Sequence, residues 1–273
     1  MSIRKRLGRR MIKIFRSTNG QRFLDRWAVR FDIWRGYGAG AYVEDSGEAV
    51  LFDLLVRDKT RSEKITVFDV GANIGDFTAA ALHALGPNVL VHAFEPAHEV
   101  FATFSQRFAG NKHVIPNNAA LGHVSEERPL FSVGRDDGLS SLVQRRLENG
   151  ETAQFQETVN VLPLTDYCAS AGIDRINLLK IDVEGLELEV LRGAKSLFEN
   201  GKIDICSFEF GGCNLDSRTY LRDFFEFFRG YDMRIFRITP AATIVELPRY
   251  HEQLERFTTT NYVATSRQPP ARP

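Results

Sequence analysis

The chain has 273 residues, of which 43% are apolar and 26% are charged, with 35 basic and 35 acidic side chains. This composition is typical of a globular protein with one large α/β domain or two small ones, and it excludes disordered, collagenous and membrane-spanning classes. The balanced total hides an asymmetry. Residues 1–30 contain ten basic residues and one acid, Asp25, so the remainder has 25 basic and 34 acidic residues and a net charge of −9.

The first predicted elements are two helices in this basic segment. Apolar residues recur at helical spacing before and after a break at residues 17–20, namely Ile3, Leu7, Met11, Ile14 and Phe15, then Leu24, Trp27, Ala28 and Phe31. One hypothesis is peripheral contact of residues 1–20 with an anionic membrane, where each basic residue contributes about 1 kcal/mol. The alternatives are a solvated helix packed on the body, a nucleic-acid arm and an organelle-targeting leader. No apolar stretch typical of a secretory signal follows the charges.

Strands and helices alternate through the rest of the chain. The predicted strands are 65–70, 89–94, 113–116, 158–162, 177–182, 203–210, 233–238 and 262–264, and the predicted helices are 77–85, 99–108, 165–171, 186–200 and 218–229. This alternation predicts an α/β fold with a mostly parallel sheet and helices on both faces. We therefore expect a helical extension over 1–45, one domain over 46–265 and a disordered tail over 266–273.

The turn after the first strand is the first candidate site. Gly71 and Gly75 lie in a strand–turn–helix, but Asn73 replaces the middle glycine of the dinucleotide fingerprint, and no Walker lysine follows. Asp69 precedes the turn, and a carboxylate there would repel a pyrophosphate but attract an ammonium group. Glu95 ends the next strand, 24 residues after Gly71, where an acid binds ribose hydroxyls. If Asp69 and Glu95 share one cavity, the pair selects S-adenosylmethionine over NAD.

The strand over 177–182 indicates a second candidate site at the same edge of the sheet. Lys180, Asp182 and Glu184 alternate with apolar residues as this strand ends, and Glu209 interrupts the next apolar strand. We expect Asp182, Glu184 and Glu209 to surround an acceptor hydroxyl, with Asp182 or Glu209 as the base. A buried ion pair between Lys180 and Glu209 is the structural alternative. The acids are too sparse for us to assign a metal.

Several stretches of the chain resemble the FkbM-type family of S-adenosylmethionine-dependent methyltransferases. They are FDVGANIGDFT (68–78), FEP (94–96), NNAALG (117–122), LLKIDVEGLELEVLRGA (178–194) and the acid in SFEF (207–210). The resemblance covers about 50–265 and implies a class I, Rossmann-like fold of seven strands with the last antiparallel. It implies O-methylation of a small molecule or glycan. It also implies that Asp69 and the turn 71–75 (Gly71, Ala72, Asn73, Gly75) hold the methionine part, Glu95 the ribose, and that Asn118 lies near the adenine.

Two other functions stay open at this point, a nicotinamide-dependent oxidoreductase and a non-catalytic nucleotide-binding accessory protein at a membrane. The irregular segment 123–155, with Arg135, Asp136, Asp137, Ser140 and Ser141, is where an acceptor-binding loop is expected. Cys168, Cys206 and Cys213 form no C-x-x-C pair, which favours a reducing, cytoplasmic location. We expect no nucleic-acid partner, and the sequence does not indicate an oligomeric state.

Overall fold

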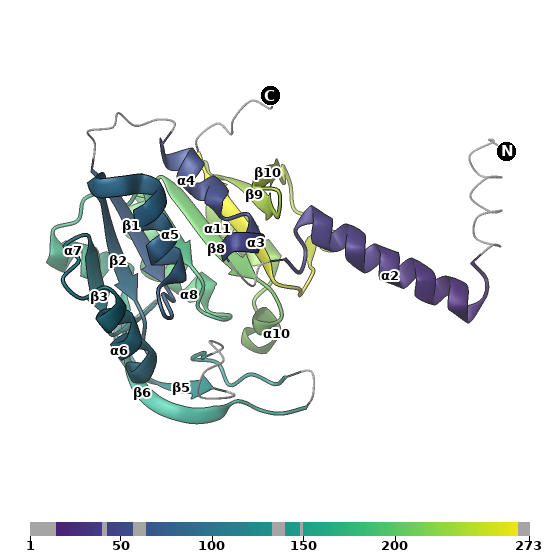
Figure 1. Cartoon of the computed structure of the whole chain (residues 1–273), viewed down its shortest axis with the longest axis horizontal. Helices are drawn as coiled ribbons and strands as arrows, with labels where there is room; N and C mark the ends of the chain where they lie inside the picture. Colours follow the sequence, from purple (N-terminus) through teal and green to yellow (C-terminus); the bar gives the residue numbers. More distant parts are fainter. Residues whose placement is uncertain (1–14, 40–42, 57–63, 133–139, 148–149, 267–273) are drawn as a thin grey trace.

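The computed structural model describes residues 15–39, 43–56, 64–132, 140–147 and 150–266. Its centre is an eight-stranded sheet with the order β10-β9-β11-β8-β7-β1-β2-β3 (Figure 1). The strands are β1 (Ile65–Val70), β2 (Val89–Phe94), β3 (Val114–Asn117), β7 (Leu178–Ile181), β8 (Ile205–Phe210), β9 (Arg234–Thr239), β10 (Thr243–Glu246) and β11 (Thr260–Thr265).

The predicted fold class is confirmed, and the main sheet has one strand more than the seven that the family resemblance implies. β3, β2, β1, β7 and β8 are parallel, and β11, the last strand of the chain, is antiparallel to both β8 and β9. The eighth strand, β10, forms an antiparallel hairpin with β9 at the sheet edge. The sequence analysis missed β10 because its four residues are only half-buried and carry no continuous apolar run.

Helices cover both faces because neighbouring residues of each central strand point to opposite sides. Val67 and Leu178 pack in one core with α4 (Ala49–Val56) and α5 (Asp76–Leu85). Phe68 and Leu179, their neighbours in sequence, pack in a second core, to which α7 (Leu164–Ala171), α8 (Glu187–Gly193), α9 (Lys195–Glu199) and α11 (Leu221–Arg229) contribute. The remaining helices are α2 (Thr18–Arg35), α3 (Val43–Ser46), α6 (His98–Arg107) and α10 (Cys213–Ser217), with short 3₁₀ turns at Gly86–Asn88 and Glu252–Leu254.

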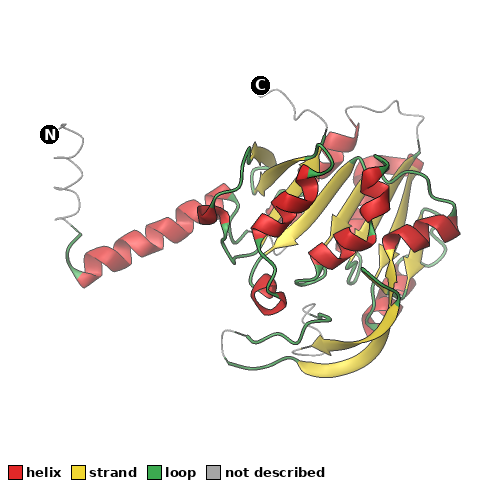
Figure 2. Ribbon diagram, turned by 180° about the vertical axis from the view of Figure 1, so that it is seen from behind, coloured by secondary structure: helices red, strands yellow, loops and turns green. Residues whose placement is uncertain are grey.

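A second, three-stranded sheet occupies much of the segment that the sequence left irregular. Its strands are β4 (Ala120–Gly122), β5 (Glu126–Ser132) and β6 (Gln154–Pro163), in the order β4-β6-β5. Figure 2 shows β6 as a long, curved strand beyond the end of the main sheet. Residues 126–132 and 154–155 are therefore strand and not loop, whereas Arg135, Asp136 and Asp137 lie outside the described residues.

The helix expected over 186–200 is divided into α8 and α9 at Ala194. The division lies where the chain passes against β4: a Cβ added to Gly193 would come within 1.9 Å of the Gly122 carbonyl oxygen. The Thr165 hydroxyl also donates a hydrogen bond to the Gly193 carbonyl, at 2.9 Å. Contact with the small sheet, which local periodicity does not encode, therefore interrupts the helix.

At the N-terminal side, α2 extends away from the body (Figures 1 and 2). This helix contains the second predicted helical stretch, whereas the first, at residues 3–14, lies outside the described residues, as does 267–273 of the expected tail. Among the helices that the structure describes, none is long and apolar enough to cross a membrane.

Candidate functional site

A cavity lies at the carboxyl ends of β1, β2 and β7, where ligands bind in open α/β sheets. It encloses about 770 Å³ of empty space, part of it open to solvent, which is within the range of small-molecule sites. Strands β4 and β5 of the small sheet, together with Leu142 between β5 and β6, supply an apolar wall. The polar lining comes from the strand ends, and the lining residues include Gly71, Asn73, Glu95, Pro96, Asp182, Glu184, Phe94, Leu121, Leu130, Ser140, Ser141 and Leu142.

The turn after β1 requires its first glycine for close packing. Gly71 has φ of 79°, and an added Cβ would lie 1.8 Å from the Asp182 carbonyl oxygen, so the turns after β1 and β7 contact each other through their backbones. Asn73 is also left-handed, with φ of 48°, and its side-chain oxygen accepts a hydrogen bond from the Ile74 amide at 2.7 Å. A short polar side chain tolerates this conformation, which explains Asn at that position.

Gly75 has a different reason to be glycine. Its φ is 94°, and an added Cβ would lie 2.4 Å from the Phe108 ring and 2.9 Å from the Phe104 ring. It is not among the residues that line the cavity, nor is Ala72, whose amide donates to the Phe94 carbonyl at 2.9 Å. Both residues shape the turn from behind, so the structure does not place them against a ligand.

Glu95 lines the cavity and also supports the turn. Its carboxylate accepts hydrogen bonds from the backbone amides of Asn73, at 3.0 Å, and Ala97, at 2.9 Å. Each oxygen retains a lone pair for a ligand hydroxyl. Burial raises the pKa of Glu95 to about 7, although the two amides act in the opposite direction. The carboxylate is therefore positioned to bind a diol and titrates near neutral pH.

Asp69 does not share this cavity, which corrects the sequence argument. Its side chain is fully buried, its Oδ2 accepts a hydrogen bond from the Thr78 hydroxyl at 2.7 Å, and its Oδ1 lies 3.4 Å from the Lys180 ammonium. Burial raises the pKa of Asp69, opposed by Lys180 and by Thr78. Alternation along β1 directs this side chain toward α5 and away from the cavity, so direct contact with a ligand ammonium is not supported.

Lys180 connects the buried acids to the cavity. Its ammonium lies 3.3 Å from Asp182, which lines the cavity, and donates to the Gly71 carbonyl at 3.4 Å. Burial acts to lower the pKa of Lys180, but Asp182, Asp69 and Glu48 together raise it above its usual value. The ion pair expected as an alternative, between Lys180 and Glu209, is not the one formed. Lys180 therefore connects the turn after β1, through Gly71, with the turn after β7, through Asp182.

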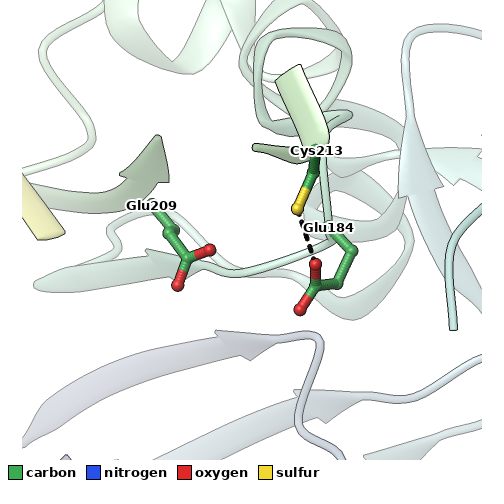
Figure 3. A group of neighbouring side chains, drawn as sticks. All are labelled: Glu184, Glu209 and Cys213. Carbon is green, nitrogen blue, oxygen red and sulfur yellow. Dashed lines mark hydrogen bonds between the residues drawn. The ribbon is translucent and has the colours of Figure 1, made fainter. Parts of the chain in front are cut away.

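Glu184, Glu209 and Cys213 form a further cluster of neighbouring side chains (Figure 3). One potential ligand atom from each lies within 4.8 Å of the other two. The Cys213 thiol donates to Glu184 at 2.7 Å, and Arg145 forms an ion pair with the same carboxylate at 2.7 Å. Burial raises the pKa of Cys213 and, with the negative charge of Asp182, the pKa of Glu184. A protonated thiol and an arginine already satisfy Glu184, so we assign no metal to the group.

Glu209 itself does not line the cavity. Its pKa is raised well above the usual value by burial and by the charges of Asp182 and Glu184. No ion pair to Glu209 occurs within the described part of the chain. The structure thus brings Asp182 and Glu184 into the cavity and places Glu209 beside them, next to Glu184.

Asn118 also lies behind the cavity wall. Its side-chain amide donates to the carbonyls of Glu95 and Pro96, both at 2.9 Å, so it fixes the turn after β2. The neighbouring residues 119–121 provide the wall instead. Ser140 and Ser141, expected in an acceptor loop, both line the cavity, and the Ser141 hydroxyl donates to the Glu184 carbonyl at 2.8 Å.

Sequence reasoning missed four residues around the site: Glu48, Arg145, Glu187 and Cys213. Glu187, at the start of α8, is buried and accepts hydrogen bonds from the Gly185 amide at 2.9 Å and from Asn214 at 3.1 Å. Glu48 is buried near Lys180, and burial raises its pKa to about 7. Glu187 carried a usable signal, since it lies in the KIDVEG-x-E stretch. The other three had none in their local sequence.

The model of the methyltransferase FkbM domain family matches residues 69–235. The chain is 29% identical over 168 residues to "Methyltransferase 1" of Beauveria bassiana, covering 51% of this chain and 64% of that protein. It is 36% identical over 154 residues to "31-O-demethyl-FK506 methyltransferase FkbM" of Streptomyces tacrolimicus, covering 47% and 59%. The chain therefore spans about three fifths of the length of these curated relatives.

A solved structure, methyltransferase FkbM from Methylobacillus flagellatus, overlaps with a TM-score of 0.45 and 19% sequence identity. The overlap covers 74% of this chain and 44% of that one. The family assignment rests on the sequence match and not on this overlap.

Proposed function

Because the chain belongs to the methyltransferase FkbM domain family, we propose that it transfers a methyl group from S-adenosylmethionine to a hydroxyl of a small molecule or glycan. The observation that carries the proposal is the cavity at the carboxyl ends of β1, β2 and β7, with Glu95 and Asp182 in its lining. One relative is named as a methyltransferase of 31-O-demethyl-FK506, a name that states methylation at an oxygen. That name supports a hydroxyl acceptor here.

The cavity residues fit a nucleoside with a cationic tail. Glu95 can accept a ribose hydroxyl while keeping its two backbone hydrogen bonds, and the apolar side chains of Leu121, Leu130 and Leu142 suit an adenine ring. Asp182, with its side chain 37% exposed, puts negative charge at the cavity wall. Bound S-adenosylmethionine supplies a methyl group already activated by its sulfonium. The protein's part is then to orient the acceptor oxygen and exclude water, worth about 7–11 kcal/mol of the barrier.

We assign the proton acceptor to Glu209. As the acceptor oxygen forms its bond to the methyl carbon and the carbon–sulfur bond breaks, the hydroxyl proton must leave, and a carboxylate that takes it contributes about 10²–10⁴-fold. Asp182 is engaged by Lys180 at 3.3 Å, whereas the pKa of Glu209 is raised by burial and negative neighbours. A raised pKa makes the ionised Glu209 carboxylate a stronger proton acceptor than an ordinary carboxylate, and unlike Asp182 it has no ion-pair partner among the described residues, which favours Glu209.

The test separates binding from turnover. S-adenosylhomocysteine at 100 times its dissociation constant should stabilise the folded protein by about 2.7 kcal/mol, seen as a rise of several degrees in Tm. A Tm rise with NAD, and none with S-adenosylhomocysteine, would overturn the proposal in favour of the oxidoreductase. Tritiated methyl transfer into hydroxylated small molecules and bacterial surface-glycan fractions then identifies the acceptor class.

The Glu209→Gln variant tests the assignment of the base. It should keep the Tm rise with S-adenosylhomocysteine and lose about 10²–10⁴-fold in kcat, because the amide cannot take the proton. The matched control is Glu199→Gln, on the exposed face of α9, which should change neither. Full turnover by Glu209→Gln would make the base assignment wrong and leave the methyltransferase proposal standing.

A further inference from the structure

A row of aromatic rings runs along α2, and none of the other residues that the structure describes buries it. The row, here called the aromatic stripe, is Phe15, Phe23, Trp27, Phe31 and Trp34, whose successive ring centres lie 6.2, 6.2, 5.7 and 5.5 Å apart. From Phe23 onward the spacings of four, four and three residues keep the rings on one face of the helix. No residue of α2 is buried, and Phe31 and Trp34 are 52% and 64% exposed. An uncovered apolar surface of this kind marks an interaction site.

Positive charge flanks one side of the aromatic stripe. Arg22, Arg26 and Arg30 recur every four residues, and the Arg30 guanidinium lies 5.4 Å from the centre of the Trp27 ring. The acids of α2 are Asp25 and Asp32, but Asp32 is engaged by Arg35 at 3.2 Å and by Arg256. The surface that α2 offers is therefore aromatic and cationic together.

The C-terminal end of α2 is fixed to the body. The Tyr37 ring lies between Arg237 and Arg256, whose guanidinium carbons are 4.3 and 4.5 Å from its centre, and Arg237 also hydrogen-bonds to its hydroxyl. The Gly38 amide donates to the Thr259 carbonyl at 2.9 Å. Cation–π contacts at buried positions are worth more than those at the surface, so this joint holds the helix.

The joint lies at the same sheet edge as the cavity. Thr260 at the start of β11 pairs with Phe210 at the end of β8, so Thr259 is at the carboxyl edge of the parallel strands. Gly36 packs there as well, where an added Cβ would come within 2.3 Å of the Ile238 carbonyl oxygen near the end of β9. Whatever binds α2 is therefore held near the edge where the cavity opens.

We propose that α2 lies in the headgroup region of an anionic lipid bilayer, with the aromatic stripe toward the acyl chains and Arg22, Arg26 and Arg30 among the lipid phosphates. Aromatic rings favour the boundary between headgroups and acyl chains, and guanidinium groups bind phosphate in a bidentate way. The charges favour this occupant over a second copy of the chain, because two stripes facing each other would bring their arginine rows together. The seven other basic residues of 1–30, against Asp25 as the one acid of that segment, add attraction of the same sign. This inference does not depend on the proposed reaction.

The two tryptophans make a direct test available. Trp27 and Trp34 are the only tryptophans of the 273-residue chain, so its tryptophan fluorescence reports on α2 alone. The full chain is titrated with vesicles of phosphatidylcholine and phosphatidylglycerol, and with vesicles of phosphatidylcholine only. We expect an emission blue shift and co-sedimentation with the anionic vesicles, both weakened by high salt, and little response to the neutral ones.

A charge variant tests the contribution of α2 to membrane binding separately from that of the basic residues before it. The triple change Arg22→Gln, Arg26→Gln and Arg30→Gln should weaken binding about 100-fold, since each basic residue strengthens it about fivefold. The matched control replaces three exposed basic residues of the body, Lys195, Lys202 and Arg222, by Gln and should bind as the parent does.

Three results would overturn the proposal. The first is the absence of co-sedimentation with anionic vesicles. The second is co-sedimentation with an unchanged emission spectrum, which would place the membrane contact in the residues before α2 and not in α2. The third is a blue shift without lipid that grows with protein concentration, together with dimer formation in sedimentation velocity, which would identify a second copy as the occupant.

Discussion

Replacing Lys180 by Met should destabilise the fold strongly, because it leaves buried carboxylates without their cation. The Lys180 ammonium lies 3.4 Å from Asp69, which is fully buried, and 3.3 Å from Asp182. Removing one partner of a buried ion pair costs about 3–5 kcal/mol, since the remaining charge keeps its desolvation penalty. The loss also releases the Gly71 carbonyl, which Lys180 binds at 3.4 Å, so the turn after β1 should loosen.

Urea unfolding followed by circular dichroism measures this cost. With an m-value of about 3 kcal/mol/M, the midpoint should fall by about 1–2 M. The double variant Lys180→Met/Asp69→Asn should regain part of the loss, because both charges are then gone. Lys202→Met is the control, since its partner Asp174 is 98% exposed, and it should cost under about 1 kcal/mol. A loss below about 1 kcal/mol for Lys180→Met, or strict additivity with Asp69→Asn, would refute the reasoning.

Three further predictions follow from the site. The pKa of Glu95 is about 7 and ligand hydroxyls favour its ionised form, so calorimetry should show S-adenosylhomocysteine binding tighten from pH 6 to pH 8, and Glu95→Gln should lose this dependence. Gly75→Ala should lower Tm, by a cost of over about 1 kcal/mol in unfolding free energy, because φ is 94° and the added Cβ meets the Phe108 ring. Burial raises the pKa of Glu48 from 4.5 to about 7, so the stability that protonated Glu48 contributes below pH 4.5 is lost as the pH rises through 7. The free energy of unfolding should therefore fall between these pH values by up to about 1.4 kcal/mol per pH unit, and Glu48→Gln should flatten that fall. A Glu48→Gln variant with the same pH profile of unfolding as the parent would contradict this prediction.

Local patterns were sufficient where one segment alone decides the structure. The bounds of β1 and β2 agree with the predicted strands, because each mostly apolar segment is followed by a turn signal, Gly71 after β1 and Glu95-Pro96 after β2. Gly71 and Glu95 both line the cavity, because the carboxyl ends of parallel strands meet at one edge of the sheet; their binding roles stay predictions. The strand predicted over 158–162 lies within β6 of the small sheet, but β4, β5 and the pairing of the three strands were not predicted, because that pairing joins separate segments of the chain.

The sequence by itself determined that an α/β sheet carries acids at its carboxyl edge, and which residues those acids are. Only the tertiary structure decided which acid faces a ligand and which is neutralised inside the protein. Asp69 and Lys180 come from strands that are adjacent in the sheet but more than one hundred residues apart in the chain. The side of a strand from which a carboxylate projects, and the cation that it meets there, depend on that pairing. The local sequence does not encode this strand pairing. The pairing is nevertheless decisive, because burying a charge is costly unless an opposite charge lies close to it.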